Sequence, residues 1–139
     1  MSGRVFLDTN VLVNADDADT GAKQARAQEV VRDALTSGRG VISTQVLCEF
    51  FVIATRKLGV PAEVARRKVE LLAHLDVVCP DVLDVVAAID LCRLHRLALW
   101  DALVIRAAQT GGCQTLLTED LSHGSRYDGV LVENPFLDL

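Results

Sequence analysis

Short apolar segments alternate along this chain with longer segments of helical character, and this alternation limits the folds that the chain can adopt. The apolar segments do not alternate apolar with polar residues, and they comprise residues 4–7, 40–42, 77–78, 113–117 and 129–132. Strands of this kind are typical of a sheet that is covered on both faces. Helical spacing and capping residues predict helices between them, at residues 11–14, 21–37, 44–58, 61–74, 81–95 and 100–110.

The order of these elements predicts an α/β fold. Strands that alternate with helices form a parallel sheet with helices on both faces, so we expect a three-layer α/β/α sandwich around a short, mostly parallel sheet. A length of 139 residues favours one domain that spans residues 1–139. A hydrophobic content of 50% excludes a disordered chain.

The chain offers no signal that would direct it to a membrane. No apolar run approaches the roughly 20 residues that a membrane-spanning helix needs. The first residues, MSGRVFLDTN, reach an acidic residue too early for a signal peptide. We therefore expect a cytoplasmic protein.

The charge distribution leaves two interpretations open. The formal net charge is −5, which is unusual for a protein that binds nucleic acid through a basic surface. Within residues 56–68, however, cations outnumber acids, and these cations are Arg56, Lys57, Arg66, Arg67 and Lys68. They form either a solvated helix face or a patch for a polyanion.

Cysteines and histidines show no spacing that is typical of a metal site. The chain has four cysteines and three histidines, with no C-x-x-C pair and no closely spaced histidine pair. The cysteines lie among apolar residues, so we expect buried free thiols at Cys48, Cys79, Cys92 and Cys113.

Acidic residues follow two of the predicted strands. Asp8 comes directly after residues 4–7, and the tripeptide Thr118-Glu119-Asp120 comes directly after residues 113–117. Ligands of open α/β sheets bind beyond the carboxyl ends of the strands. Taken singly, each acid is equally compatible with an ordinary turn or a helix cap.

Two further acids interrupt apolar helix faces. Glu49 lies in VLCEFFVIA, and Asp101 lies in LALWDALVIRAA. We expect both side chains to face the core, where a charge costs several kcal/mol unless it is paired or bound to a metal. A salt bridge or a cap is the structural alternative, and Asp101 in a first helical turn also suits the helix dipole.

Together the four acids point to a divalent cation. Carboxylates about 4 Å apart repel by a few kcal/mol at an effective dielectric constant near 20, so a cluster needs protons or cations. Hard ions such as Mg²⁺ and Mn²⁺ prefer oxygen ligands. Such an ion activates water and neutralises charge on a phosphodiester. The chain contains no nucleophile elbow, P-loop or dinucleotide-binding motif.

The ordered set of motifs resembles the PIN-domain family, and it is most similar to VapC-type toxins of bacterial toxin–antitoxin pairs. The set comprises FLDTNVLV, a helix with Glu49 at its middle, LALWDALVIRAA, GCQTLLTEDLSHG and VENPF. The resemblance covers nearly the whole chain, in order and at matching spacing. The first motif alone is weak, whereas the ordered set is specific.

The resemblance implies a fold, an activity and a site. The fold would be the PIN sandwich, and the activity would be Mg²⁺- or Mn²⁺-dependent endoribonuclease hydrolysis of RNA. The family's catalytic and metal-binding acids match Asp8, Glu49, Asp101 and Asp120. Asn10 matches a residue that steadies the first aspartate, and Thr118 matches a small hydroxyl. Glu119 could share the role of Asp120, which we favour.

The resemblance also implies partners, namely a second copy of the chain and a cognate antitoxin. Residues 21–74 are rich in alanine, valine and leucine, so we expect part of their surface to contact a partner.

Two alternatives to the ribonuclease remain: a PIN-like RNA- or protein-binding module without catalysis, and a haloacid dehalogenase-like phosphatase. The phosphatase needs a second aspartate where this chain has Asn10. It also needs a lysine later in the chain, and no lysine follows Lys68.

Overall fold

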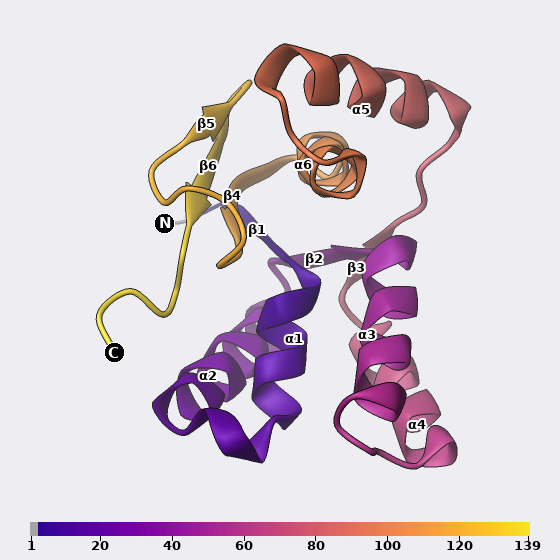
Figure 1. Ribbon diagram of the computed structural model, residues 1–139, viewed down its shortest axis with the longest axis vertical. Helices are drawn as coiled ribbons and strands as arrows, with labels where there is room; N and C mark the ends of the chain where they lie inside the picture. Colours follow the sequence, from indigo (N-terminus) through magenta and orange to yellow (C-terminus); the bar gives the residue numbers. More distant parts are fainter. Residues whose placement is uncertain (1–2) are drawn as a thin grey trace.

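A six-stranded sheet runs through the middle of the molecule in the order β3-β2-β1-β4-β6-β5 (Figure 1). The computed structural model describes residues 3–139, so the first two residues of the N-terminal segment MSGRVFLDTN lie outside the described part. All neighbouring strands are parallel except β5 and β6. The strands are β1 (Arg4–Leu7), β2 (Gly40–Ser43), β3 (Asp76–Val78), β4 (Cys113–Leu117), β5 (Arg126–Tyr127) and β6 (Val130–Glu133).

Helices cover both faces of the sheet, which confirms the predicted three-layer α/β/α sandwich (Figure 1). One side carries α1 (Thr9–Asp16), α2 (Ala22–Ser37), α3 (Thr44–Arg56) and α4 (Ala62–Leu72), with a 3₁₀ turn, η1 (Ala18–Thr20), after α1. On the other side α6 (Leu99–Thr110) packs against β2, β4 and β6, and α5 (Val82–His95) packs on α6.

The strands are apolar throughout because both faces are covered. Phe6 and Leu7 of β1 are fully buried, and so are Val41 and Ile42 of β2. Successive side chains of a strand point to opposite faces, so consecutive buried residues require packing on both sides. The absence of polar alternation in the sequence therefore predicted the layering correctly.

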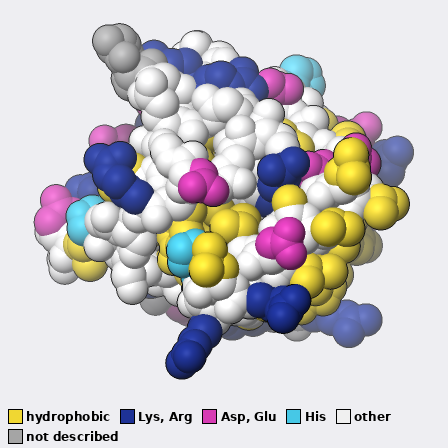
Figure 2. Space-filling view, turned by 90° about the horizontal axis from the view of Figure 1, so that it is seen from above, with side chains coloured by type: hydrophobic (Ala, Val, Ile, Leu, Met, Phe, Trp, Pro, Cys, Tyr) yellow, Lys and Arg dark blue, Asp and Glu magenta, His cyan; other side chains and the backbone are white. Residues whose placement is uncertain are grey.

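The outer face of α5 is the exception to this packing. Its exposed apolar side chains include Leu83 at 73% and Leu94 at 75% of their accessible surface, together with Val82, Val86 and Ile89. Figure 2 views the molecule from the α5 side and shows apolar side chains gathered toward one edge of this surface. No element within residues 3–139 covers this face.

Besides η1, which was not predicted, two elements differ from the predictions. Strand β5 was not predicted, although Asp128-Gly129 is a strong hairpin signal; both residues have positive φ, 46° and 89°, as a two-residue turn of the primed type requires. Helix α1 is longer than the predicted residues 11–14. It begins at Thr9 because the Asp8 side chain accepts a hydrogen bond from the Thr9 amide as an N-cap.

The order of the strands decides where a ligand can bind. The chain enters at β1, adds β2 and β3 on one side, and then returns to place β4 on the other side of β1. Leu7 pairs with Leu117 in parallel register, so the residues that follow the two strands lie at the same edge. This is a topological switch point, where open α/β sheets bind ligands.

The remaining predictions concern the membrane and the cysteines. No helix within residues 3–139 is long and apolar enough to cross a bilayer. All four cysteines are free, as predicted, but only Cys113 is buried. The prediction of burial is wrong for Cys48, which lies between Val46 and Phe50 on α3 and faces away from the core that these two residues enter. It is also wrong for Cys79, which is exposed just after the edge strand β3, and Cys92 is half-buried.

Candidate active site

The four predicted acids line one cleft at the switch point, so the structure brings together the residues that the sequence singled out. The cleft has a volume of about 750 Å³ and lies among α1, α3, the start of α6 and the loop after β4. Its polar lining includes Asp8, Asn10, Glu49, Asp101, Glu119 and Asp120. Apart from Glu49, these residues follow a strand or begin a helix, which agrees with a site at the carboxyl edge of the sheet.

Asp8 is the most buried of the four acids, with 6% of its surface exposed. Its Oδ1 accepts a hydrogen bond from the Thr9 amide at 2.7 Å, and its Oδ2 accepts one from Thr118 Oγ1 at 2.9 Å. The pKa of Asp8 is raised to about 6, mainly by burial; the two hydrogen bonds lower the pKa, and the nearby charges of Asp120 and Glu49 raise it. Asp8 is thus both a helix cap and a carboxylate that is costly to ionise.

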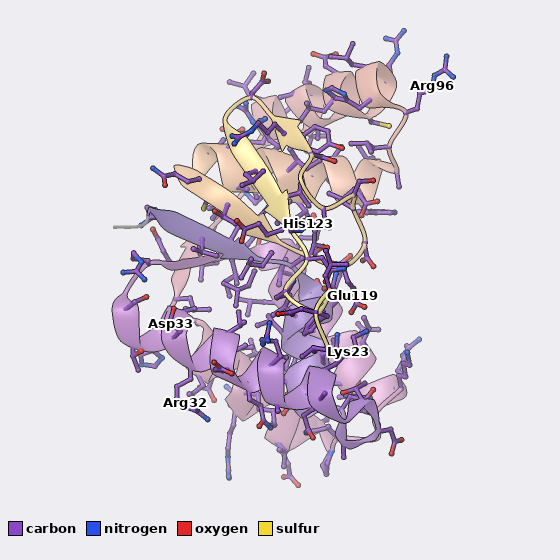
Figure 3. All side chains as sticks on the ribbon, turned by 90° about the vertical axis from the view of Figure 1, so that its left-hand side faces the viewer. Lys23, Arg32, Asp33, Arg96, Glu119 and His123 are labelled. Carbon is purple, nitrogen blue, oxygen red and sulfur yellow. The ribbon has the colours of Figure 1, made fainter. Side chains whose placement is uncertain are left out.

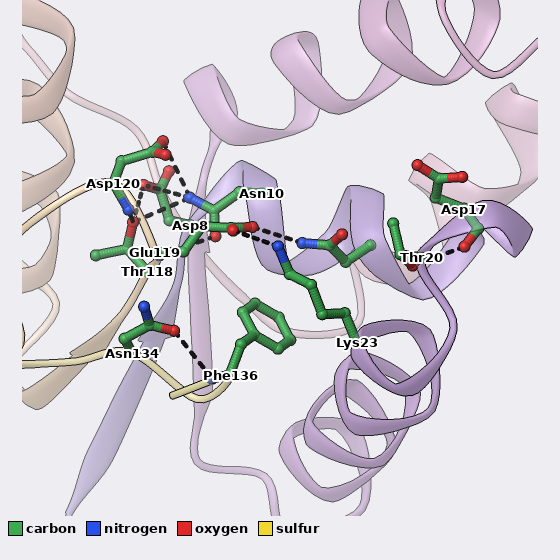
Figure 4. Close-up of polar contacts among 11 residues, drawn as sticks. Asp8, Asn10, Asp17, Thr20, Lys23, Thr118, Glu119, Asp120, Asn134 and Phe136 are labelled. Carbon is green, nitrogen blue, oxygen red and sulfur yellow. Dashed lines mark hydrogen bonds and ion pairs between the residues drawn. The ribbon is translucent and has the colours of Figure 1, made fainter. Parts of the chain in front are cut away.

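Asn10 connects the two strand ends, as Figure 4 shows. Its Nδ2 donates to Thr118 Oγ1 at 3.0 Å and to Asp120 Oδ2 at 3.1 Å, with a longer contact of 3.4 Å to Asp8 Oδ2. Its Oδ1 accepts a hydrogen bond from the Glu119 amide at 3.2 Å. One amide side chain therefore fixes the carboxylates of Asp8 and Asp120 relative to each other.

Glu49 is held from α1 and from its own helix. Thr9 Oγ1 donates to Glu49 Oε1 at 2.8 Å, and Gln45 Nε2 lies 3.4 Å from Oε2. The prediction that the Glu49 face of α3 packs in the core is wrong. Val52 on that face is 47% exposed, because the core-facing residues are Val46, Phe50 and Ala54 and this side of the helix forms the cleft wall.

Asp101 lies in the first turn of α6 and is half-buried. Burial raises its pKa, and the negative charges of Asp120 and Glu49 add to the rise.

The salt-bridge alternative fails for all four acids, because none of them takes part in the six ion pairs formed within residues 3–139. The cleft therefore contains mutually repelling carboxylates.

Glu119 has a different environment from Asp120. Figure 3 shows Glu119, on the loop after β4, close to Lys23 near the start of α2. Lys23 Nζ lies 2.6 Å from Glu119 Oε1, and Asn14 Nδ2 donates to Oε2 at 2.7 Å. The charge of Glu119 is thus neutralised by a protein cation, whereas that of Asp120 is not.

Several residues that contact the acids were not predicted from the sequence, namely Thr9, Asn14, Lys23 and Gln45. Gln45 precedes Glu49 by one helical turn, so i,i+4 spacing is a signal that could have identified it. Lys23 and Asn14 reach Glu119 only through tertiary packing. No pattern in the sequence relates them.

The five cations of the predicted cluster lie in different environments. Lys68 pairs with Asp16 at 2.7 Å, and Arg66 pairs with Glu70 at 3.4 Å along α4. Of the five residues, only Lys57 lines the acidic cleft. Two of the five cations are therefore engaged in ion pairs, and one faces the cleft.

The donor set of the cleft suits a hard cation. In the described part of the chain, no three His, Cys, Asp or Glu side chains stand close enough to form a complete ligand set by themselves. Mg²⁺ does not need one, because it keeps several waters and binds through one or two carboxylates. The carboxylate oxygens of the four acids agree with that requirement, because no ion pair among residues 3–139 engages them.

Similar solved structures share this fold across almost the whole chain. A toxin–antitoxin complex from Klebsiella pneumoniae is 19% identical, with a TM-score of 0.68 over 95% of this chain and 98% of that one. DNA-bound VapBC from Salmonella typhimurium is 22% identical, with a TM-score of 0.68 over 96% and 98%. Mycobacterium tuberculosis VapC20, a toxin that cleaves the sarcin–ricin loop, is 20% identical, with a TM-score of 0.64 over 81% and 86%.

The sequence itself identifies the family of this chain. No curated protein matches it significantly. The family model that matches is the PIN domain, over residues 5–127, a range that contains all four acids of the cleft. The match spans most of the 139 residues. The chain therefore belongs to the PIN domain family.

Proposed function

We propose that this protein is an endoribonuclease that hydrolyses RNA phosphodiesters with Mg²⁺ or Mn²⁺, and that it acts as the toxin of a toxin–antitoxin pair. The observation that carries the proposal is the cleft that Asp8, Glu49, Asp101 and Asp120 line together, although none of them forms an ion pair with a lysine or arginine among residues 3–139. Membership of the PIN family supports it, and so does the neighbour described as a toxin that cleaves the sarcin–ricin loop.

The proposed roles follow from the contacts of each acid. Asp8, Asp101, Glu49 and Asp120 would hold the metal, which when bound supplies an activated water and neutralises charge on the scissile phosphate. Thr118 and Asn10 orient Asp8 and Asp120 through hydrogen bonds. Glu119 serves as an anchor between the loop and α2, because its charge is already balanced by Lys23.

The raised pKa of Asp8 supports a cation as the partner of this cluster. Burial and the neighbouring carboxylates favour the protonated form of Asp8. A divalent cation would reverse that preference, because it binds the ionised carboxylates and removes their repulsion. A binding module without catalysis has no need of this arrangement, and PIN family membership leaves the phosphatase alternative without support.

We propose that the antitoxin binds to a second, mainly apolar groove of about 510 Å³ among α1, α2, α3 and α4. Its apolar lining includes Leu12, Val31, Leu35, Phe50, Leu71 and Leu72. The parts of the groove on α2, α3 and α4 lie within residues 21–74, where the sequence predicted partner contacts, and α1 adds lining residues from outside that range. Its rim carries the Lys68–Asp16 ion pair and Arg32, so an amphipathic segment would suit it.

We further propose a homodimer that buries the outer face of α5. The side chains of Leu83, Val86 and Ile89 are exposed on one helix, and neighbouring exposed apolar side chains of this kind mark interaction surfaces. Leu83→Glu is expected to produce monomers in sedimentation velocity experiments, and a persistent dimer would exclude this face. The proposed toxin would occupy the whole of residues 1–139 as one domain and act in the cytoplasm.

Cleavage of a mixed single-stranded RNA pool in Mg²⁺ tests the activity. Alanine substitution of Asp8, Glu49, Asp101 or Asp120 is expected to abolish most cleavage while the melting transition persists. EDTA is expected to do the same to the wild type. Asp33→Asn is the matched control, because Asp33 is an exposed acid on α2, outside the cleft (Figure 3). Cleavage that continues in EDTA would exclude the metal mechanism.

The toxin role needs a separate experiment in cells. Expression of the chain alone is expected to arrest growth, and co-expression of the gene next to it is expected to restore growth. The Asp8→Asn protein, expressed at the same level, serves as the inactive control. Equal growth in all cultures with active protein present would contradict the toxin role and leave the nuclease activity standing.

A further inference from the structure

Trp100 is the one aromatic side chain that the described residues leave exposed. Its exposed fraction is 63%, whereas Phe6, Phe50 and Phe136 are buried and Phe51 and Tyr127 are half-buried. An indole has a large apolar face that is normally covered. The exposure of this one tryptophan therefore points to a role on the surface, and the residues around it indicate which role.

Those surroundings are the acidic cleft. Trp100 is the second residue of α6 and directly precedes Asp101, and both residues line the cleft with Asp8, Glu49 and Asp120. Gln45 Nε2 lies 3.4 Å from the Trp100 carbonyl and 3.4 Å from Glu49 Oε2. One glutamine thus contacts both the backbone at Trp100 and an acid of the site.

The wall beside Trp100 is largely apolar and contains Cys48, Val52 and Val104. Phosphate groups would therefore meet the acids and their metal, while an uncharged, flat group would find apolar surface next to them. In single-stranded RNA, the planar group beside each phosphate is a base. Proteins commonly hold such unpaired bases by stacking them on aromatic side chains.

Trp100 differs in this respect from the apolar residues on α5. Leu83, Val86, Ile89 and Leu94 are also exposed, but none of them lines the cleft. They form the face that we assign to the dimer. Among residues 3–139, only Trp100 combines an exposed aromatic ring with a position beside the carboxylates.

We propose that Trp100 is a base-binding residue, on which one unpaired base next to the scissile phosphate stacks. The proposal rests on the proposed ribonuclease function and adds to it a subsite for a single-stranded substrate. It implies that double-stranded RNA of the same sequence binds poorly, because its bases are not free to stack on a side chain.

The chain contains a single tryptophan, so its fluorescence reports on this subsite alone. The Asp8→Asn protein, in Mg²⁺, would be titrated with a single-stranded RNA hexamer of mixed sequence. A hexamer of the same ribose-phosphate backbone without bases is the matched probe. We expect the hexamer with bases to quench the tryptophan emission and the base-free hexamer to leave it unchanged. Equal quenching by both would overturn the proposal.

Steady-state cleavage gives an independent readout. In Trp100→Ala, kcat/KM for the single-stranded hexamer is expected to fall about tenfold, mainly through KM, whereas Trp100→Phe keeps most of it. Leu137→Ala is the matched control, because Leu137 is similarly exposed, at 60%, but lies outside both the cleft and the α5 face that we assign to the dimer. Melting temperatures of all three variants verify that they fold.

The outcomes separate this proposal from the function on which it rests. If the wild type cleaves RNA and Trp100→Ala cleaves it equally well, the base subsite is wrong and the ribonuclease stands. If Trp100→Ala only dissociates the dimer, Trp100 belongs to the subunit interface and the subsite is again wrong. If the wild type cleaves no RNA, the ribonuclease is wrong, and the fluorescence titration still decides whether a base binds at Trp100.

Discussion

Lys23 Nζ lies 2.6 Å from Glu119 Oε1, and this ion pair joins α2 to the loop that carries Asp120. The lysine side chain also passes over the ring of Phe136, at 5.2 Å from its centroid. Neighbouring acids on one loop thereby acquire different properties, because Glu119 faces a cation and Asp120 faces other carboxylates.

From this ion pair we predict that Glu119 stabilises the fold, whereas Asp120 is needed for RNA cleavage. Glu119→Gln is expected to lower the free energy of unfolding by about 1–2 kcal/mol, because a partly buried charged hydrogen bond is lost. It is expected to retain most RNA cleavage, whereas Asp120→Asn loses it. Urea denaturation and initial cleavage rates check the two effects. Equal losses of activity would show that the two acids share one role.

Asp101→Asn distinguishes a metal site from a structural ion pair. The substitution removes one of several repelling charges and little volume, so metal-free stability is expected to stay unchanged or to rise by about 1 kcal/mol. Saturation of the wild type with Mg²⁺ at 100 times Kd would add about 2.7 kcal/mol. Melting curves at increasing Mg²⁺ are expected to show a much smaller gain in Asp101→Asn. Strong destabilisation with an undiminished Mg²⁺ response would identify Asp101 as a structural anion.

The raised pKa of Asp8 predicts the pH dependence of metal-free stability. The folded protein keeps a proton on Asp8 up to a pKa of about 6, whereas the ordinary aspartate value is 3.8. Protonation of Asp8 therefore stabilises the folded state fully below the ordinary pKa of 3.8, and this stabilisation is lost as the pH rises through about 6. The contribution to the free energy of unfolding is up to about 3 kcal/mol. Urea denaturation in EDTA between about pH 4 and about pH 7 measures it.

The matched control for this titration is Asp8→Asn, which has no proton to release at that position. Its stability is expected to vary less over the same pH interval. If Asp8→Asn shows the same fall, another group causes it. Mg²⁺ is expected to weaken the fall in the wild type, because the ion binds the ionised carboxylate.

Lys57 is predicted to guide RNA to the cleft, because it is the one member of the cationic cluster that lines it. Lys57→Ala is expected to weaken RNA binding and to lower the slope of log affinity against log salt by about 1. Arg67→Ala is the control, since Arg67 is exposed on α4 and lies outside the cleft. Fluorescence anisotropy of labelled RNA at several salt concentrations measures both slopes. Equal slopes in both variants would show that the cluster is a solvated surface.

The sequence by itself determined the layering and the acids. Short apolar strands without polar alternation require cover on both faces, and Phe6, Leu7, Val41 and Ile42 are buried accordingly. Asp8 and Asp120 could be predicted from their positions after strands, and Glu49 and Asp101 from the interrupted apolar patterns around them. These signals are local, because they depend on residues within a few positions of each other.

Only the tertiary structure decided how the acids are held and which side chains surround them. The links from Asn10 to Asp120, from Thr9 to Glu49 and from Lys23 to Glu119 join residues 40 or more positions apart. The exposure of Trp100 likewise depends on α3 and α6 leaving a cleft between them. Such contacts follow from the strand order and the packing of helices on the sheet, and no periodic pattern along the chain encodes them.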